Sequence, residues 1–346
     1  MALKEFILSS SLAIAVCLGA AAQSPAPVAV TMDADATTLD WMAAHGSAIL
    51  TLDRREDDGD LARWDALTAN ARIIGLGEQT HGSNEFSRVK LRLIAHGVRS
   101  QHVTVIGWEN APAPIAAINR YLRGEPADVD SLMSKLSRLW RTEEVKAVIA
   151  WLHDHNAEQR ARGGTQVDMV GIDVMNAHPA RDSAMAECMA AAIASRADGE
   201  RAMFWAHNIH VSYLPNRIGV ELRRLVGTRY VALGFGTAEG TYRAHAPSNP
   251  QPVQSDGHVL PASTPGSLEV NFARLRPRLG GLAQLYDLRA IIADARGAWL
   301  TTPRSFRHVG TNAAPVIQVE NVGTMFDLLL FVPTTTSSHS IPGIQM

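Results

Sequence analysis

Cysteine is nearly absent from this chain, which has two in 346 residues, Cys17 and Cys188. Because Cys17 lies in an N-terminal segment that we expect to be removed, Cys188 is left alone and an intrachain disulfide is excluded. Cys188 lies in a helical apolar run, where a buried small side chain is a better interpretation than a nucleophile. The folded chain must therefore derive its stability from a hydrophobic core.

Charge is sparse as well. Charged residues make up 19% of the chain, against about 25% in ordinary soluble domains. The chain has 32 Lys and Arg residues and 34 Asp and Glu residues, so the net charge is −2. The missing basic surplus argues against a nucleic-acid-binding protein that works by bulk charge. The 46% hydrophobic fraction excludes a disordered chain. No nucleic-acid partner is expected, and the sequence predicts no particular oligomeric state.

Long apolar runs are missing beyond the N-terminus. Lys4, an apolar run over 6–18 and the small residues Ala20-Ala21-Ala22 predict a cleaved signal peptide over residues 1–22. The run is shorter than the ~20 residues of a comfortable membrane span, although an N-terminal anchor is the alternative. We therefore expect an exported protein, periplasmic or secreted, with no stable membrane span after cleavage. Residues 23–38 are Pro/Ala-rich and predict a linker, and residues 39–346 predict one domain.

Short apolar runs alternate with helical patterns along this domain. A first helix is expected over 39–52, and further helices over 84–96, 180–195 and 219–225. Strands are expected over 71–77, 102–108, 167–172, 201–206 and 229–235, and later over 241–245, 316–319 and 326–332. The alternation indicates parallel pairing through crossovers, and the later strands break it. The prediction is an α/β fold with a mixed, mostly parallel central sheet flanked by helices. Residues 112–160, helical without strands, predict an inserted helical lobe over the cleft.

Acidic and histidine residues follow four successive predicted strands. They are Glu78 and His81 after the first, Glu109 after the second, Asp173 after the third, and His207 and His210 after the fourth. Ligands of open α/β sheets bind outside the carboxyl ends of the strands, so we expect these side chains to converge. Independent caps and turn residues are the alternative interpretation. Asp173, Trp108 and Asn208 are candidates for substrate binding, with hydrogen bonding to the backbone, core packing and loop ordering as their respective structural alternatives.

Several catalytic motifs are missing. The sequence has no Gly-x-Ser-x-Gly, which disfavours a nucleophilic serine, and no His-Glu-x-x-His, which disfavours an ordinary zinc peptidase. Carboxylates and imidazoles remain, and these suit general-base activation of water without a cofactor. The alternative is a divalent metal ion held by His81, His207, His210 and Glu109, in a metal-dependent hydrolase of peptides or other amides and esters. A non-catalytic binding protein is a third possibility.

Three motifs resemble the erythromycin esterase family. They are Gly75-Leu-Gly-Glu-Gln-Thr-His-Gly82, Ile106-Gly-Trp-Glu109 and Trp205-Ala-His-Asn-Ile-His210. The resemblance continues at 140–145, 171–173 and 181–186, with weaker signals at 286–289 and 326–327. It therefore runs from about residue 40 to 335. The motifs occur in the family's order and at similar spacing.

The resemblance implies an α/β fold with a helical lobe and a deep cleft, and hydrolysis of a macrolide lactone as in the characterised antibiotic-resistance enzymes. It implies that His81 is the general base for water, that Glu78 supports it and that Glu109 lines the site. His207 and His210 are implied to be needed, and a covalent serine intermediate is not. The expected partner is therefore a small-molecule ester or lactone substrate.

Overall fold

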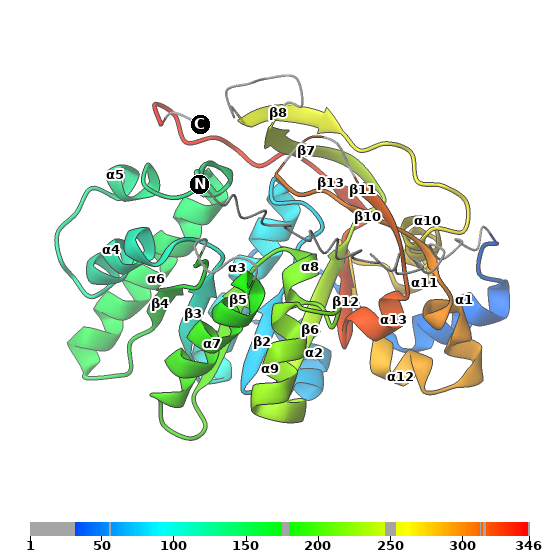
Figure 1. Cartoon of the computed structure of the whole chain (residues 1–346), viewed down its shortest axis with the longest axis horizontal. Helices are drawn as coiled ribbons and strands as arrows, with labels where there is room; N and C mark the ends of the chain where they lie inside the picture. The colour runs from blue at the N-terminus through cyan, green and yellow to red at the C-terminus, as the bar shows by residue number, and fades with distance from the viewer. Residues whose placement is uncertain are drawn as a thin grey trace, which may run out of the picture.

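The computed structural model describes residues 32–54, 57–174, 180–245, 254–311, 313 and 316–344. The predicted signal peptide and residues 23–31 of the predicted linker lie outside them. The described chain folds around an eight-stranded sheet of order β1-β9-β12-β6-β2-β5-β3-β4 (Figure 1). Its strands are β1 (Gly46–Ile49), β2 (Ile73–Leu76), β3 (Val103–Trp108), β4 (Asp168–Gly171), β5 (Arg201–Trp205), β6 (Tyr230–Gly236), β9 (Ala283–Asp287) and β12 (Leu328–Phe331).

Pairing is parallel from β12 through β6, β2, β5 and β3 to β4, whereas β9 runs antiparallel to both β1 and β12. This confirms the predicted mixed, mostly parallel sheet flanked by helices. The five earlier predicted strands, at β2 to β6, are all present, and they form the parallel half of the sheet without interruption. Their carboxyl ends therefore meet at one edge.

Helices cover both faces of the sheet (Figure 1). One face is covered by α2 (Ala62–Thr68), α3 (Asn84–Ser100), α4 (Pro112–Leu122), α5 (Val129–Met133) and α6 (Glu143–Arg162). The other is covered by α1 (Ala36–Ala44), α7 (Arg181–Ala194), α8 (Asn208–Val211), α9 (Ile218–Val226), α10 (Leu268–Ala273), α12 (Leu288–Ile292) and α13 (Val322–Met325). The short helices η1 (Gly59–Leu61), η2 (Arg138–Trp140), η4 (Gly227–Arg229), η5 (Ala295–Thr301) and α11 (Arg276–Leu279) lie in the connections. Within the described ranges, no helix combines the length and apolar character needed to cross a membrane.

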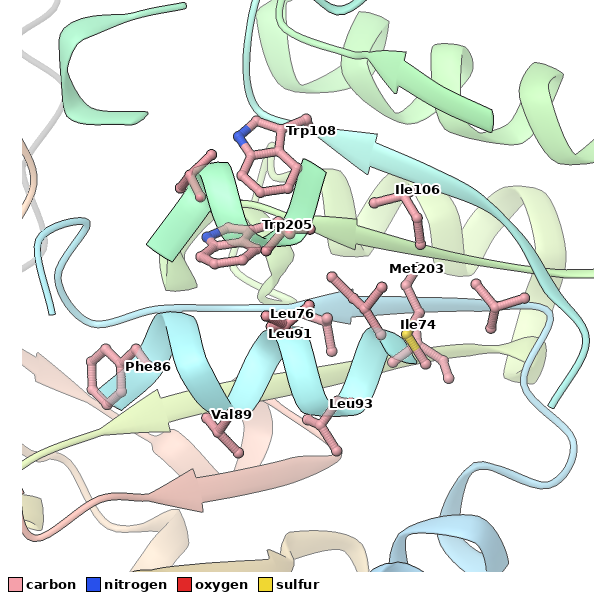
Figure 2. Close-up of a cluster of buried hydrophobic side chains, with 14 of the residues drawn as sticks. Ile74, Leu76, Phe86, Val89, Leu91, Leu93, Ile106, Trp108, Met203 and Trp205 are labelled. Carbon is pink, nitrogen blue, oxygen red and sulfur yellow. The ribbon is translucent and has the colours of Figure 1, made fainter. Parts of the chain in front are cut away.

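The core explains why the strands are almost wholly apolar. All four residues of β2 are buried, with Ile74 and Leu76 in the hydrophobic cluster of one face and Ile73 in that of the other. Figure 2 shows α3 lying along the first face, with Phe86 and Val89 among its buried side chains. A strand that is covered on both sides needs apolar residues at every position, because successive side chains point to opposite faces.

The C-terminal part adds two small sheets at the edge where the parallel strands end (Figure 1). One contains β7 (Glu239–His245), β8 (Gln254–Val259) and β13 (Thr334–Thr335), and the other β10 (Arg304–His308) and β11 (Val316–Glu320). The Arg243 N–H donates to Gly82 O over 3.0 Å, and the Val309 N–H donates to Gln79 O over 2.9 Å. Both small sheets are thus attached to the loop that follows β2.

Two predicted boundaries were wrong. The helix expected over 39–52 ends at Ala44, and β1 begins at Gly46 and pairs with β9 at Tyr286. A Cβ at position 46 would lie 2.7 Å from a Leu279 methyl and 2.9 Å from the Tyr286 ring, so the pairing needs glycine there. The predicted linker also reached too far, because α1 starts at Ala36 with the Asp35 carboxylate accepting from the Thr38 N–H over 2.7 Å.

Residues 112–160, predicted as an inserted helical lobe, form α4, α5, η2 and most of α6. The helices α4 and α6 pack beside the sheet, α4 against β4 and α6 against α3. The segment reaches the polar residues that follow the strands through Trp140, whose indole N–H donates to Glu109 O over 2.9 Å.

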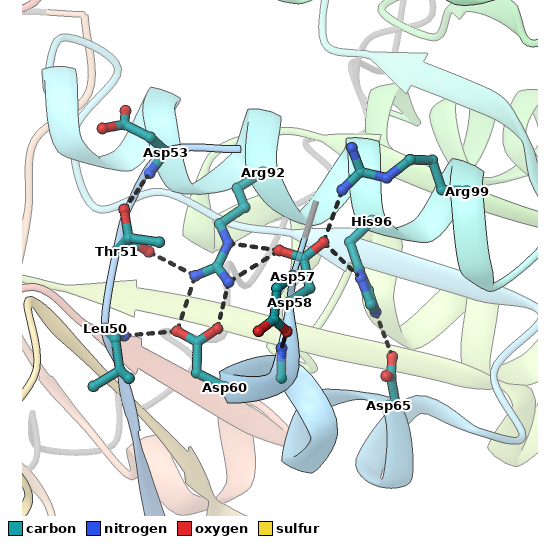
Figure 3. A network of polar contacts seen from close by, with 11 residues as sticks. Leu50, Thr51, Asp53, Asp57, Asp58, Asp60, Asp65, Arg92, His96 and Arg99 are labelled. Carbon is teal, nitrogen blue, oxygen red and sulfur yellow. Dashed lines mark hydrogen bonds and ion pairs between the residues drawn. The ribbon is translucent and has the colours of Figure 1, made fainter. Parts of the chain in front are cut away.

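A buried charge network attaches α3 to the loop after β1 (Figure 3). The Arg92 side chain is fully buried and donates to both Asp58 and Asp60, and to Thr51 O over 2.7 Å. His96, one turn further along α3, lies between Asp58 and Asp65 at 3.1 and 2.7 Å. Removing one partner of a buried ion pair leaves an uncompensated charge, at a cost of about 3–5 kcal/mol.

Replacing this arginine should therefore destabilise the fold strongly. Arg92→Met is expected to lower the free energy of unfolding by about 3–5 kcal/mol, measured by urea denaturation. Arg88→Met is the matched control, because Arg88 lies on the same helix but pairs with Asp53 at the surface with its side chain 38% exposed. An exposed pair contributes at most about 1 kcal/mol. Equal losses of unfolding free energy in the two variants would contradict the assignment of Arg92 to a buried ion-pair network.

Candidate functional site

Glu78 is a buried carboxylate with three donors. It follows β2 and is 1% exposed. His81 Nδ1 lies 2.5 Å from Oε1, and Oε2 accepts from Lys90 Nζ at 2.6 Å and from Trp205 Nε1 at 2.7 Å. A charged carboxylate is tolerated in such a place only when it is paired and hydrogen-bonded in this way. Glu78 is therefore fixed in position and directs its charge at one nitrogen of His81.

His81 presents its other nitrogen to the site. Since the Glu78 carboxylate accepts from Nδ1, His81 carries a hydrogen on Nδ1, and in the neutral ring Nε2 then carries the lone pair. Among the described residues, Nε2 has no hydrogen-bond partner. The ring lies against Trp140, edge-on at 5.3 Å between centroids, and at 5.1 Å from the His207 ring. The next residue, Gly82, must be glycine, because a Cβ there would lie 1.9 Å from Arg243 O.

Lys90 supports Glu78 from α3. Its ammonium is fully buried and lies 4.2 Å above the Trp205 ring and 5.1 Å from the Phe235 ring. Burial lowers the pKa of Lys90 to about 8, although the Glu78 carboxylate opposes this change. Lys90 is held beside Glu78 by the ion pair and by two aromatic faces.

Glu109 and His210 form a second buried ion pair. His210 Nε2 lies 3.2 Å from Glu109 Oε1, and Nδ1 lies 2.9 Å from Asp182 Oδ2. Burial alone would lower the pKa of His210, but the two carboxylates outweigh it and raise the pKa to about 9. Burial likewise opposes ionisation of Glu109, yet the charge of His210 and its hydrogen bond hold the pKa of Glu109 well below the ordinary range. At neutral pH the pair is therefore a carboxylate and an imidazolium.

Asp173 is paired with an arginine that the strand pattern did not predict. Arg181, the first residue of α7, donates from Nε and Nη2 to both Asp173 oxygens at 2.8 and 2.9 Å. Its Nη2 also lies 3.3 Å from Glu109 Oε1. Hydrogen bonding to Asp173 raises the pKa of Arg181 further. Asp173, Arg181 and the Glu109–His210 pair thus form one continuous charged group, with Asp173 oriented by arginine.

His207 lies between the two groups. Its backbone N–H donates to Glu109 Oε2 over 2.8 Å, and its Nδ1 accepts from the Ile209 N–H over 3.3 Å. The ring hydrogen therefore belongs on Nε2, which is buried and lacks a hydrogen-bond partner in the described structure. Burial lowers the pKa of His207 well below its ordinary value. His207 is a neutral imidazole with an unpaired N–H.

The structure brings together the acids and histidines that follow the strands, Asp173 through its pairing with Arg181. Two of the three residues proposed for substrate binding, Asn208 and Trp108, are instead buried in contacts within the protein. Asn208 is fully buried, and its amide exchanges hydrogen bonds with Phe235 N and O at 2.9 and 2.7 Å. Its role here is to tie α8 to β6. Trp108 is 1% exposed and packs between Trp140 and Trp205, at 5.5 and 4.6 Å between ring centroids. Trp108 therefore belongs to a buried cluster of three indole rings, with Trp140 and Trp205.

Each of the four predicted alternative metal ligands has a partner within the protein, His81 being hydrogen-bonded to Glu78. Glu109 and His210 are ion-paired, and His207 Nδ1 accepts a backbone hydrogen bond. Among the residues that the structure describes, no three His, Cys, Asp or Glu side chains are arranged to hold a metal ion.

Cys188 is partly buried on α7, and burial raises the pKa of its thiol.

The strand-end pattern did not predict four site residues: Lys90, Arg181, Asp182 and His308. Arg181 and Asp182 lie in the segment 181–186 that resembles the family. Lys90 lies inside a helix, where a lone lysine gives no signal. Arg181 and Asp182 begin α7, and an arginine–aspartate pair at a helix start is a weak indication that could have been followed. His308 ends β10, which is distant in sequence, and its ring lies 6.0 Å from that of His207.

A cavity of about 640 Å³ lies away from this group, between residues 53–54, the start of α3 and the start of α6. None of the predicted site residues lines it. Two ion pairs lie at this cavity, Arg88 with Asp53 and Glu144 with His339. The chemistry is therefore concentrated at the strand ends and not at this cavity.

Solved structures share the fold. A succinoglycan biosynthesis protein is 18% identical with a TM-score of 0.70, and covers 87% of this chain and 97% of its own. A Bacillus cereus protein is 18% identical with a TM-score of 0.71, and covers 88% and 98%. The erythromycin esterase EreC, as a histidine-to-asparagine mutant in its open conformation, is 16% identical with a TM-score of 0.62, and covers 84% and 98%.

The sequence itself matches a family profile. Residues 98–180 and 174–335 match the profile described as erythromycin esterase, and together they span more than half of the chain. The match includes Glu109, Asp173 and the two histidines of the 205–210 motif, whose geometry is described above. The chain therefore belongs to the erythromycin esterase family.

Proposed function

We propose that the chain hydrolyses a carboxylic ester or lactone of a small molecule, with water as the nucleophile, His81 as its general base and no metal ion. The observation that carries the proposal is the Glu78–His81 hydrogen bond of 2.5 Å, which leaves the Nε2 lone pair directed away from Glu78. A buried carboxylate that orients a histidine and stabilises its charged form is the arrangement found in catalytic triads. Here a water molecule takes the place of the serine.

The reaction balances with His81 alone as proton carrier. His81 Nε2 takes a proton from water while the water oxygen bonds to the carbonyl carbon and the carbonyl π electrons move to its oxygen. When this intermediate collapses, the bond from carbon to the leaving oxygen breaks and His81 returns the proton to that oxygen. The products are an acid and an alcohol, joined in one molecule when the substrate is a lactone. Glu78 stabilises the imidazolium between the two steps.

The two remaining histidines divide into different roles by charge and contacts. His207 is neutral and its Nε2–H is unpaired, 5.1 Å from His81 between ring centroids, so it suits donation to the carbonyl oxygen as that oxygen becomes negative. His210 is charged, and both of its nitrogens face carboxylates. It therefore serves to hold Glu109, which in turn fixes the backbone of His207.

Membership of the family favours a lactone as substrate, and the fold shared with EreC makes a macrolide ring the first compound to try. Opening of such a ring would make the protein an antibiotic-resistance enzyme. Other family substrates would use the same groups, because the proposed steps need only an ester carbonyl that reaches His81.

The decisive experiment is incubation of the purified chain with a 14-membered macrolide and with p-nitrophenyl butyrate, with and without a chelator. Mass spectrometry is expected to show a gain of one water on at least one compound, unchanged by the chelator. A gain that disappears with chelator and returns with added metal would contradict the metal-free proposal. Absence of any hydrolysis would contradict the ester assignment.

The matched variants for this experiment are His81→Ala and His153→Ala. Loss of a positioned general base is expected to reduce turnover by about 10²- to 10⁴-fold. His153 lies on α6 with its side chain 29% exposed, away from the strand ends, and its replacement should leave turnover unchanged. Full activity of His81→Ala would refute the role of His81.

The Glu109–His210 pair should make stability depend on pH. The pKa of His210 is about 9 in the folded chain, against about 6.5 for a free imidazole. A pKa raised by folding stabilises the protein fully below the unfolded value, and the stabilisation is lost as pH rises through the folded value. The advantage of wild type over His210→Gln in free energy of unfolding should therefore shrink between pH 6.5 and 10, by roughly 2–3 kcal/mol.

Denaturation by urea at several pH values measures this difference. Titration of Lys90 affects both proteins and cancels in the comparison. A gap between wild type and His210→Gln that stays constant from pH 6.5 to 10 would show that His210 is not charged in the folded protein.

A further inference from the structure

His308 is placed beside the site by the loop that carries the base. Val309, the next residue, pairs with Gln79 and Thr80, and its N–H donates to Gln79 O over 2.9 Å. The buried Gln79 side chain donates to Arg307 O over 2.8 Å and accepts from the Thr237 N–H over 2.8 Å. The end of β10 is thus fixed to the segment between Glu78 and His81. Any shift of that segment would move His308 with it.

The His308 ring is buried without a polar partner. It is 2% exposed, and both ring nitrogens lack a hydrogen bond within the described structure. The nearest carboxylate, Glu320, lies 3.9 Å from Nε2, beyond hydrogen-bond distance, and the edge contact with Phe306 is apolar. Burial lowers the pKa of His308 to about 4, so the ring is neutral at ordinary pH. Buried polar atoms are nearly always paired, which makes this histidine an exception that needs a reason.

The neighbour of His308 offers that reason. The His207 ring lies 6.0 Å away between centroids, and its Nε2–H is also unpaired. An oxygen about 2.9 Å from a ring nitrogen lies about 4 Å from the ring centre, so one oxygen can accept from both rings at this separation. Within the described structure, His207 Nε2 and both nitrogens of His308 have no other hydrogen-bond partner. The separation of the two imidazoles therefore allows them to share a single acceptor.

We propose that His308 acts with His207 as a second hydrogen-bond donor to the carbonyl oxygen of the substrate as that oxygen becomes negatively charged. This inference rests on the ester hydrolysis proposed above and adds a catalytic residue to it. Donors fixed in a water-poor site stabilise developing charge without reorganising, and a neutral imidazole can serve as such a donor. His308 neither gains nor loses a proton in the reaction.

Kinetics of two variants test the proposal, with p-nitrophenyl butyrate or the macrolide as substrate. His308→Phe keeps the ring shape and removes the donor, so kcat is expected to fall about 10²- to 10³-fold with KM nearly unchanged. His308→Gln retains an N–H donor and should keep activity within about tenfold of wild type. Ser305→Ala, on the same strand, is the control that should leave both constants unchanged.

Stability separates this role from a structural one. Phenylalanine removes unpaired polar atoms from a buried position, so the melting temperature of His308→Phe should be no lower than that of wild type. A structural histidine would give the opposite result, with a lower melting temperature that His308→Gln does not restore. Loss of activity in a protein that is equally stable supports the proposal, and full activity of His308→Phe overturns it.

Binding of a tetrahedral anion provides a readout without turnover. Wild type is expected to bind the ethyl monoester of propylphosphonic acid, and His308→Phe to bind it at least tenfold more weakly by calorimetry. The neutral planar N-ethylbutyramide should bind both proteins equally. Equal binding of the phosphonate to both proteins would overturn the role of His308 alone. If wild type neither hydrolyses an ester nor binds the phosphonate, the proposed function itself fails.

Discussion

The site depends on one buried charge, the carboxylate of Glu78. This carboxylate is shielded from water, so it is stabilised by hydrogen bonds from Lys90, Trp205 and His81. These residues lie on α3, on β5 and in the loop after β2. Any arrangement that left Glu78 unpaired would be costly in free energy. The packing of α3 on the sheet and the orientation of His81 are therefore coupled. The core of this face, formed by apolar side chains, keeps three polar groups directed at one carboxylate.

The surroundings of the two histidines of the 205–210 motif give them different charge states. His207 is buried beside His81 and stays neutral, while His210 faces Glu109 and Asp182 and becomes charged. Residues of one type, three positions apart, thus receive opposite charge states from their surroundings. A neutral donor close to the base, with a charged group behind it, suits the ester hydrolysis by water proposed above.

Much of the site could be predicted from the sequence, because polar residues after parallel strands must meet at one edge of the sheet. The rule does not apply to groups that arrive from elsewhere. Lys90 comes from within a helix, and His308 from a strand of a separate small sheet, so neither follows a central strand. The rule also does not predict which of these side chains bind the core instead of the site. The Asn208 amide, for example, donates to Phe235 O on β6. The helix expected over 39–52 was too long because the pairing of Gly46 with a strand 240 residues away is a tertiary effect.

The central claim is that Glu78 fixes the hydrogen of His81 on Nδ1 and leaves Nε2 as the base. Long-range ¹H–¹⁵N NMR of histidine-labelled protein at neutral pH measures this directly, with the His81 signals assigned by their loss in His81→Gln. The account predicts that His81 carries its hydrogen on Nδ1, and that Glu78→Gln reduces this preference. A His81 ring with its hydrogen on Nε2, unaffected by Glu78→Gln, would contradict the account, because no lone pair would then face the site.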